Sequence, residues 1–218
     1  MKKDSQPEVS THAMERLCRW WRRRVDSRDP SLRPGERAGL WNRFYNSQRA
    51  RQMYSDDRTA KLGGAFLDVP EVRIVEDWGC GLGGFKPHLR ADQTYIGVDG
   101  SETPYADKIV DLVDYTSVVD GIFMRGVIEH NPSWDKILKN ALASFRHRMV
   151  LVLFTPFARR TKVIRDYPDW WGTGVTMVDI AFARDDLTRY FSGLEWSVEA
   201  NLKTKSQYKC EHIFYLRK

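Results

Sequence analysis

The fold of this chain is decided by the stretch Glu76-Asp77-Trp78-Gly79-Cys80-Gly81-Leu82-Gly83-Gly84-Phe85. The β-branched segment 72–77 leads into it, so the pattern predicts a strand, then a turn built on glycines, then the start of a helix. Glycine permits positive φ angles and lets a ligand approach the backbone closely. We therefore expect a nucleotide-type site at the carboxyl edge of a parallel sheet.

Acidic residues indicate which ligand this site would hold. The glycine spacing also matches a dinucleotide fingerprint, but Asp77 lies two residues before the first glycine and would repel a pyrophosphate. A carboxylate there suits the ammonium group of an amino acid. Asp99 ends the next strand, where a carboxylate can accept both hydroxyls of a ribose, and Asp111 follows the third strand, where it could receive the exocyclic amine of an adenine. Together the three acids describe S-adenosylmethionine.

Strand and helix patterns alternate along the rest of the chain. Apolar segments predict strands at 72–77, 94–99, 107–111, 121–124 and 148–155. Helical stretches are predicted from about residue 36 to 54 and from there up to Leu67. Helical spacing predicts further helices at 134–145, which Ser133 would cap, and at 184–191. Two alternating runs, 194–200 and 210–216, predict a closing hairpin. This order predicts an α/β fold, with a mostly parallel sheet, an antiparallel C-terminal hairpin strand and helices on both faces.

Four motifs in order resemble those of the class I S-adenosylmethionine-dependent methyltransferases. They are Asp77–Gly83, Gly97–Ser101, Asp111-Leu112, and Asp120–Phe123 followed by Val127–His130. The resemblance covers residues 73–155 closely and implies a Rossmann-like methyltransferase sheet, methyl transfer as the activity and S-adenosylmethionine as the cofactor. The cofactor-binding residues that it implies are Asp77, Gly79, Cys80, Gly81, Asp99, Gly100, Asp111, Leu112 and Arg125. For Arg125, a place in the acceptor site or a surface salt bridge are the alternatives.

The residues expected to carry the chemistry are Glu129 and His130, which follow the fourth strand. In this family that edge faces the donor methyl group. His130 has a pKa range suited to a general base acting on a hydroxyl, and a histidine that only holds the loop is the alternative. Glu129 is expected to orient or hydrogen-bond. Some relatives hold a metal with Glu-x-x-Glu-His, but Gly126 replaces the first glutamate here, so we expect no protein-held metal.

The acceptor is expected to be a hydroxyl group. Relatives that methylate nucleobase amines carry an Asn/Asp-Pro-Pro-aromatic run after the fourth strand, whereas this chain has Arg125-Gly126-Val127-Ile128. The insertion 159–183 contains Tyr167 and a pair of tryptophans, whose rings suit a sugar or an aromatic acceptor, although a hydrophobic plug beneath a loop explains them equally well. We therefore expect O-methylation of a small molecule or of a sugar or glycan.

The N-terminal third is the basic part of the chain. Residues 1–76 hold 16 Lys or Arg and 11 Asp or Glu, which accounts for most of the net charge of +6. We expect a basic helical extension or lid at 1–70 and a methyltransferase domain at 71–218. The helix expected at 13–26 admits three interpretations: a lid, a surface for RNA or an anionic membrane, or a packing helix with a solvated side. The alternative functions are therefore an RNA-directed (ribose) methyltransferase and a non-catalytic methyltransferase-like subunit that binds a partner.

Composition excludes several classes of protein. Hydrophobic residues make up 42% of the 218 residues, which excludes full disorder. The densest apolar run, Met149–Phe154, is far shorter than the ~20 residues that span a bilayer. The three cysteines are far apart and form no disulfide framework, and no signal-peptide pattern opens the sequence. We therefore expect a cytoplasmic protein.

Overall fold

The computed structural model describes residues 41–42, 45, 58–167, 177–202, 204 and 206–218. The helix expected at 13–26 lies outside these residues. Of the second expected helical stretch, 36–54, the described residues are Trp41, Asn42 and Tyr45, and all three are helical. The helix expected to end at Leu67 is confirmed as α4 (Arg58–Leu67), which packs against the sheet although it lies within the expected N-terminal extension.

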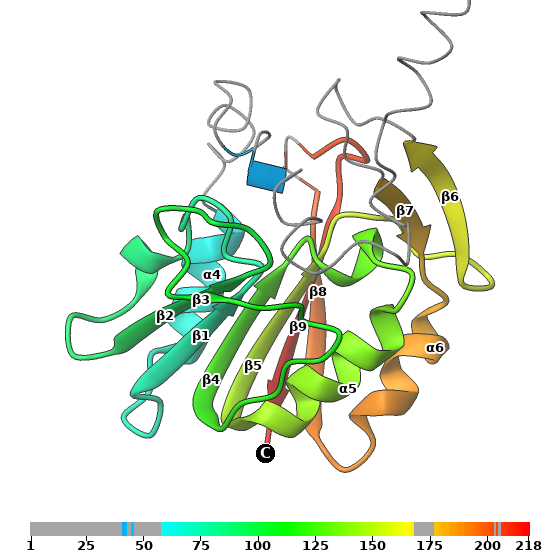
Figure 1. Cartoon of the computed structure of the whole chain (residues 1–218). Coiled ribbons are helices and arrows are strands. Elements are labelled where there is room, and N and C mark those ends of the chain that lie inside the picture. The colour runs from blue at the N-terminus through cyan, green and yellow to red at the C-terminus, as the bar shows by residue number, and fades with distance from the viewer. Residues whose placement is uncertain (1–40, 43–44, 46–57, 168–176, 203, 205) are drawn as a thin grey trace, which may run out of the picture.

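A seven-stranded sheet forms the centre of the molecule (Figure 1), in the order β3-β2-β1-β4-β5-β9-β8. Its strands are β1 (Ile74–Trp78), β2 (Thr94–Asp99), β3 (Lys108–Ile109), β4 (Val119–Arg125), β5 (Phe145–Leu153), β8 (Glu195–Asn201) and β9 (Glu211–Arg217). The first five pair in parallel, and β9 runs antiparallel to both β5 and β8. The mostly parallel sheet with its antiparallel hairpin strand is therefore confirmed.

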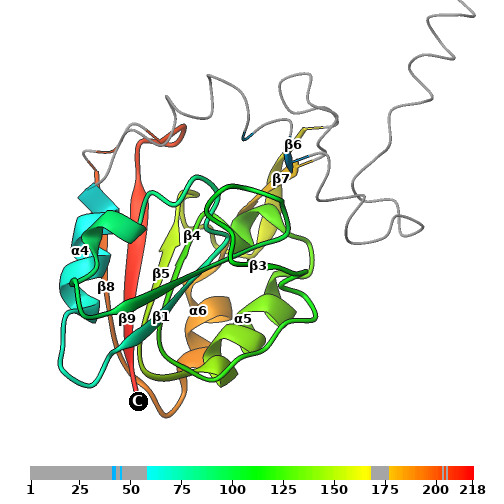
Figure 2. The ribbon, with the colours of Figure 1, turned by 60° about the vertical axis from the view of Figure 1, so that its left-hand side comes forward.

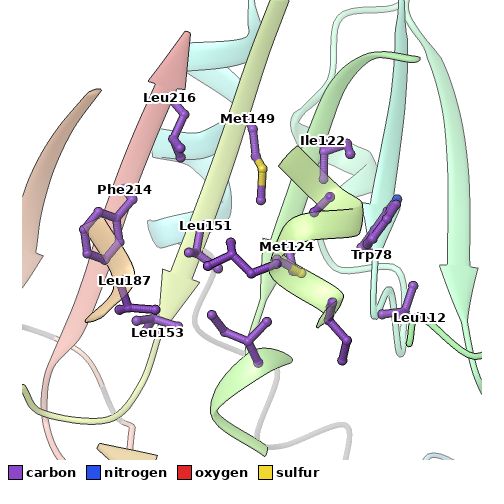
Figure 3. Packing of buried hydrophobic residues seen from close by; sticks show 14 of the residues in the cluster. Trp78, Leu112, Ile122, Met124, Met149, Leu151, Leu153, Leu187, Phe214 and Leu216 are labelled. Carbon is purple, nitrogen blue, oxygen red and sulfur yellow. The ribbon is translucent and has the colours of Figure 1, made fainter. Parts of the chain in front are cut away.

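Helices cover both faces of this sheet (Figure 2). On one face lie α5 (Trp134–Ser144) and α6 (Arg184–Thr188), which continues as the 3₁₀ helix η4 (Arg189–Phe191). Side chains of β1, β4, β5 and β9 meet these helices in the main hydrophobic core (Figure 3). On the other face α4 closes a second core. Because β5 is buried on both faces from Met149 to Leu153, its unbroken apolar run was a reliable strand signal.

Three local expectations are wrong in detail. No α-helix follows the glycine loop, and the chain forms only the 3₁₀ helix η1 (Lys86–His88), since Pro87 lacks an N–H and β2 already begins at Thr94. Ser133 occupies the N-cap position of α5, but its side chain makes no capping hydrogen bond. Its backbone N–H instead donates to Asn131 Oδ1 at 2.8 Å. The expected strand 107–111 is reduced to two residues.

The insertion expected at 159–183 contains two strands that its composition did not predict. They are β6 (Lys162–Tyr167) and β7 (Met177–Ala181), which pair antiparallel in a separate two-stranded sheet. In Figure 1 this pair stands beyond the ends of the parallel strands, at the edge where β1, β2 and β4 finish. None of the described helices is long and apolar enough to cross a membrane.

Candidate functional site

The glycine loop follows β1 directly and has the backbone that its sequence predicts. Gly79, Gly81 and Gly83 have φ angles of 76°, 49° and 67°, which L-residues with side chains rarely adopt. The N–H of Gly79 donates to the carbonyl of Val98 at 2.7 Å, so the loop is hydrogen-bonded to β2. A Cβ at Gly79 would lie 2.4 Å from Val127 Cγ2, and that position therefore tolerates no side chain.

Asp77 lies at the tip of β1 with its carboxyl group almost completely buried. Its Oδ2 accepts a hydrogen bond from the hydroxyl of Tyr95 at 3.0 Å. Burial raises the pKa of Asp77 to about 7, and the negative charge of Asp99 adds to the rise, whereas the Tyr95 hydroxyl and the charge of Arg125 oppose it. A cation that binds here would restore the ionised form.

Asp99 at the end of β2 is bonded to the glycine loop. Its Oδ2 accepts the N–H of Gly81 and its Oδ1 accepts the N–H of Ser101, both at 2.9 Å. Burial raises the pKa of Asp99, and these backbone hydrogen bonds oppose the rise. Each carboxylate oxygen has a second lone pair, so the group can still accept hydroxyl hydrogen bonds. Gly100, which follows Asp99, is exposed, and a Cβ there would make an ordinary van der Waals contact with Val110 O at 3.8 Å.

The segment after β3 brings Asp111 and Leu112 towards the same edge. Asp111 Oδ1 accepts the N–H of Val113 at 2.9 Å, which shapes a tight turn. Leu112 is nearly buried and joins the main core near Trp78 (Figure 3). The backbone of this segment is also held by Asn140 of α5, whose side chain donates to the carbonyls of Leu112 and Val113.

A buried carboxylate that the sequence did not single out anchors this segment. Glu76 on β1 is fully buried and accepts hydrogen bonds from Trp78 Nε1 at 2.8 Å, Tyr115 OH at 2.8 Å and Ser117 Oγ at 2.6 Å. It also forms an ion pair with Lys108 at 2.8 Å. Burial alone would raise the pKa of Glu76, but these hydrogen bonds hold it below its usual value. Glu76 therefore ties β1 to both sides of the Asp111 turn.

Cys80 in the glycine loop is buried and lies 3.7 Å from the carbonyl oxygen of Tyr105. Burial raises the pKa of its thiol well above the usual range, and the charges of Asp77 and Asp99 add to the rise. The thiol therefore stays protonated and is a poor nucleophile. Its sulfur atom packs against Gly97 of β2, where a Cβ would lie 3.1 Å from Sγ.

His130 ends the 3₁₀ helix η2 (Ile128–His130), which follows β4, and its partner comes from the insertion. Its Nδ1 lies 3.1 Å from Asp179 Oδ1 and 3.0 Å from the carbonyl oxygen of Val178. Since both neighbours are acceptors, Nδ1 carries a proton. Burial alone would lower the pKa of His130, but the hydrogen bond to Asp179 and the charges of Glu129 and Asp179 outweigh it, so the pKa is raised.

Two tyrosines complete this arrangement. The hydroxyl groups of Tyr167 and Tyr208 donate to Asp179 Oδ2 at 3.0 Å and 2.7 Å. Burial alone would raise the pKa of Asp179, but the hydrogen bonds and the charge of His130 bring it below its usual value. Sequence reasoning missed Asp179 and Tyr208. The one available signal was a carboxylate in the middle of the apolar segment Met177–Ala181.

Glu129 is fully buried beside His130, and burial raises the pKa of its carboxyl group. Its Oε1 accepts the N–H of Phe154 at 2.7 Å, whereas its Oε2 is buried with no hydrogen-bond partner among the described residues. Glu129 therefore joins the ends of β4 and β5, as an orienting residue would.

Arg125 at the end of β4 points into the interior rather than to the surface. Its guanidinium group pairs with buried Glu211 at 3.2 Å and lies over the ring of Phe154, 5.0 Å from the centroid. Glu211 also accepts hydrogen bonds from Thr59, Asn201 and Thr204. The charge of Arg125 still reaches Asp77, since it lowers the pKa of that carboxyl group. The salt bridge of Arg125 is therefore formed with a buried carboxylate, whereas a surface salt bridge was one of the expected alternatives.

The site residues form two groups at one edge of the sheet. Asp77, the glycine loop, Asp99 and the Asp111 turn lie at the carboxyl ends of β1, β2 and β3, and His130 with Asp179 lies at the end of the neighbouring strand β4. Across the ranges that the structure describes, no three His, Cys, Asp or Glu side chains are grouped so that they could hold a metal ion.

Comparisons with known proteins agree with this geometry. A family model described as a methyltransferase domain matches residues 45–201. None of the curated proteins gives a significant match.

The solved structures that are similar in fold include the following three. Magnesium protoporphyrin IX methyltransferase of Synechocystis PCC 6803, solved with bound S-adenosylmethionine, is 16% identical, with a TM-score of 0.59 over 87% of this chain and 100% of that one. The 1,6-didemethyltoxoflavin-N1-methyltransferase of Burkholderia thailandensis is 14% identical, with a TM-score of 0.63 over 87% and 92%. Human N-acetylserotonin methyltransferase is 12% identical, with a TM-score of 0.53 over 97% and 68%. At these identities the likeness shows the fold.

Proposed function

The chain belongs to the methyltransferase-domain family, and from this premise we propose that it transfers a methyl group from S-adenosylmethionine to a hydroxyl group of a small molecule or a sugar. The observation that carries the hydroxyl assignment is the pair of His130 and Asp179 at the end of β4. A hydroxyl acceptor must lose a proton when it is methylated, and a histidine oriented by a carboxylate is suited to take it.

The donor side of the site fits S-adenosylmethionine, which supplies an electrophilic methyl group on a sulfonium sulfur. Asp77 is a buried carboxyl group that lacks a cationic partner in hydrogen-bond contact among the described residues, and the ammonium group of the donor would provide one. Asp99 keeps lone pairs for ribose hydroxyls, and the Asp111 turn presents a carboxylate for the adenine amine. The loop residues with positive φ angles are glycines, which have no side chain, so a ligand can approach the backbone of the loop closely.

The acceptor side supports a base rather than a merely structural histidine. Because Nδ1 carries a proton towards Asp179 and Val178, the neutral ring has its lone pair on Nε2. Asp179 also stabilises the imidazolium that forms when Nε2 takes the acceptor proton. Glu129 supports the same loop from the interior, since its carboxylate is bonded to the backbone after β5. General-base assistance of this kind contributes typically ~10²–10⁴-fold to rate.

The test separates donor binding from turnover. Calorimetry with S-adenosylmethionine is run on the wild type, on Asp99→Ala and on His130→Gln, and methyl transfer to a panel of hydroxylated acceptors is measured by release of S-adenosylhomocysteine. We expect Asp99→Ala to weaken donor binding about tenfold, the scale of one charge-assisted hydrogen bond. His130→Gln should bind the donor normally and lose turnover. His147→Gln, on the far part of β5, is the matched control.

Two outcomes would contradict the proposal. If the wild type does not bind S-adenosylmethionine, the donor assignment fails. If His130→Gln turns over at the wild-type rate, His130 is not the base. The RNA-directed alternative depends on the basic N-terminal third, residues 1–76, most of which lies outside the described residues, and the partner-subunit alternative depends on residues 13–28, all of which lie outside them. No observation among the described residues favours either.

A further inference from the structure

An aromatic cluster lies over the glycine loop and connects it to the insertion. Met177 of β7 is nearly buried, and Trp41, Tyr45, Leu82 and Tyr167 pack around it. We call these five residues the aromatic cap. The Trp41 and Tyr45 rings are stacked with their centroids 6.1 Å apart. In Figure 1 the short blue helical segment that includes residue 41 lies beyond the ends of the parallel strands.

The cap touches the donor loop directly. A Cβ built on Gly81 would lie 2.9 Å from Cε1 of Tyr45, so the tyrosine ring rests against the backbone of that glycine. Leu82, the next residue of the loop, is itself part of the cap. A ligand that binds along the glycine loop therefore changes the surface on which the cap packs.

Tyr167 is part of the cap and also contacts the pair of His130 and Asp179. Its ring packs in the cap, and on β6 the guanidinium of Arg165 lies 4.7 Å from the centroid of that ring. Its hydroxyl donates to Asp179 Oδ2 at 3.0 Å, and Asp179 Oδ1 lies 3.1 Å from His130 Nδ1. A continuous series of contacts therefore runs from Gly81 through Tyr45, Met177, Tyr167 and Asp179 to the proposed base.

We propose that Tyr167 is a positioning residue that communicates occupancy of the donor site to His130. The proposal rests on the function proposed above. When the donor orders the cap, the ring of Tyr167 is held and its hydroxyl stays on Asp179. A carboxylate that accepts a hydrogen bond attracts a proton less strongly, so Asp179 then stabilises the imidazolium of His130 less and the base is more often neutral. His130 is therefore neutral, and able to accept a proton, more often when the donor is bound.

Tyr208 provides the matched control for this role. Its hydroxyl also donates to Asp179 Oδ2, at 2.7 Å, but its ring is not part of the cap. The other charged group that acts on His130 is Glu129, and Arg165 is the charged group beside Tyr167. Neither changes in Tyr167→Phe or Tyr208→Phe. Tyr167→Phe also loses the hydrogen bond that Gln207 Nε2 donates to the Tyr167 hydroxyl at 2.8 Å, so Gln207→Ala, which keeps the Tyr167 ring in the cap, is a further control and should keep the full wild-type response.

The experiment measures the pKa of His130 rather than activity. Protein labelled in its histidine rings is titrated by NMR with and without saturating S-adenosylhomocysteine, and the His130 signals are assigned by their loss in His130→Gln. In the wild type and in Tyr208→Phe we expect the ligand to lower the pKa of His130 by roughly 0.5 unit or more, the scale of one hydrogen bond. In Tyr167→Phe the displacement should fall to less than half of that.

Each other result overturns the proposal. An equal displacement in Tyr167→Phe and the wild type would show that the ligand acts on His130 by another route. Binding of S-adenosylhomocysteine without any displacement in the wild type would overturn this proposal alone. Absence of binding to the wild type, checked by calorimetry on the same samples, would overturn the proposed function as well.

Discussion

Nδ1 of His130 has two acceptors within hydrogen-bond distance, Asp179 Oδ1 at 3.1 Å and the carbonyl oxygen of Val178 at 3.0 Å. Since the backbone carbonyl remains in Asp179→Asn, the ring should keep its orientation in that variant. What it loses is the negative charge that stabilises the imidazolium. We therefore expect the turnover of Asp179→Asn to fall by ~10–100-fold, less than the ~10⁴-fold loss typical when a triad loses its only orienting carboxylate.

The measurement is steady-state kinetics with calorimetry of the donor on the same variant. Donor affinity should be unchanged within twofold. Asp114→Asn, which removes an exposed carboxylate paired with Lys136, is the control and should behave as the wild type. Wild-type turnover in Asp179→Asn would remove Asp179 from the mechanism.

The pH profile gives a second test of the same pair. The pKa of His130 is raised above its usual value of 6.5, mainly because Asp179 stabilises the charged ring. Only the neutral ring can act as a base, so kcat/KM should rise with pH along a limb centred above 6.5. In Asp179→Asn the limb should move to lower pH. A limb that keeps its position in the variant would contradict this assignment.

Asp77→Asn should separate stability from function. The pKa of Asp77 is raised from 3.8 to about 7 in the fold, so burial of the ionised group costs stability above pH 7 and the cost disappears as the pH falls towards 4. At pH 8 the asparagine variant should therefore be more stable by ~1–3 kcal/mol. It should also bind S-adenosylmethionine ~10–100-fold more weakly, because the ammonium group loses its counter-charge.

Thermal unfolding at pH 8 and pH 5 with calorimetry at pH 8 checks both parts. The stability difference between Asp77→Asn and the wild type should shrink at pH 5. Donor binding by the wild type should also weaken as the pH falls below 7, since Asp77 then has to release a proton. An Asp77→Asn variant that is less stable than the wild type at pH 8 would contradict the buried-charge explanation.

Glu76→Ala should weaken donor binding although Glu76 is not one of the residues expected to contact the donor. The substitution leaves Tyr115, Ser117 and the indole of Trp78 without their shared acceptor, and the Asp111 turn loses its anchor to β1. We expect a loss of ~2–3 kcal/mol in the free energy of unfolding and a several-fold rise in the Kd for S-adenosylhomocysteine. Glu76→Gln keeps an acceptor at the same place and should restore most of both. Equal defects in the two variants would point to the charge alone.

Gly97 on β2 and Gly100, three positions further along the chain, should respond differently to substitution by alanine. A Cβ at Gly97 would lie 2.0 Å from the carbonyl oxygen of Tyr105, so Gly97→Ala must displace backbone and should destabilise the fold by ~2–3 kcal/mol. A Cβ at Gly100 would meet only Val110 O, at an ordinary contact distance of 3.8 Å, so Gly100→Ala should fold normally. It should bind the donor more weakly if the added methyl group takes space that the donor occupies. Denaturant unfolding and calorimetry distinguish the two. Equal stability losses would refute the distinction.

The donor side could be predicted from the sequence because it is local. Asp77, the glycine loop and Asp99 lie at the ends of adjacent strands, and each strand carries its own apolar signal. Positive φ at Gly79 and Gly81 follows from the same short motif. The roles of these residues in binding stay predictions, but their meeting at one edge did not require knowledge of the tertiary structure.

The acceptor side could not be predicted in the same way. Asp179 lies 49 positions after His130 in the sequence, on β7. No sequence pattern predicted that β7 pairs with β6. The same holds for the buried pair of Arg125 and Glu211. The alternation along β9 predicts which face of the sheet Glu211 lies on, but it does not predict which residue pairs with it. Contacts of this kind depend on how insertions and strand ends dock, and that information is spread over the whole chain.

The position of β9 between β5 and β8 has a consequence for synthesis on the ribosome. When a nascent chain has emerged only as far as Asn201, β8 has no neighbour to pair with, and the apolar edge of β5 is open to other chains. When residues 211–217 emerge and form β9, this one strand pairs with both β5 and β8. A premature stop between Asn201 and Glu211 would leave a protein with the complete glycine loop and an unpaired edge at β5, which chaperones and proteases would recognise.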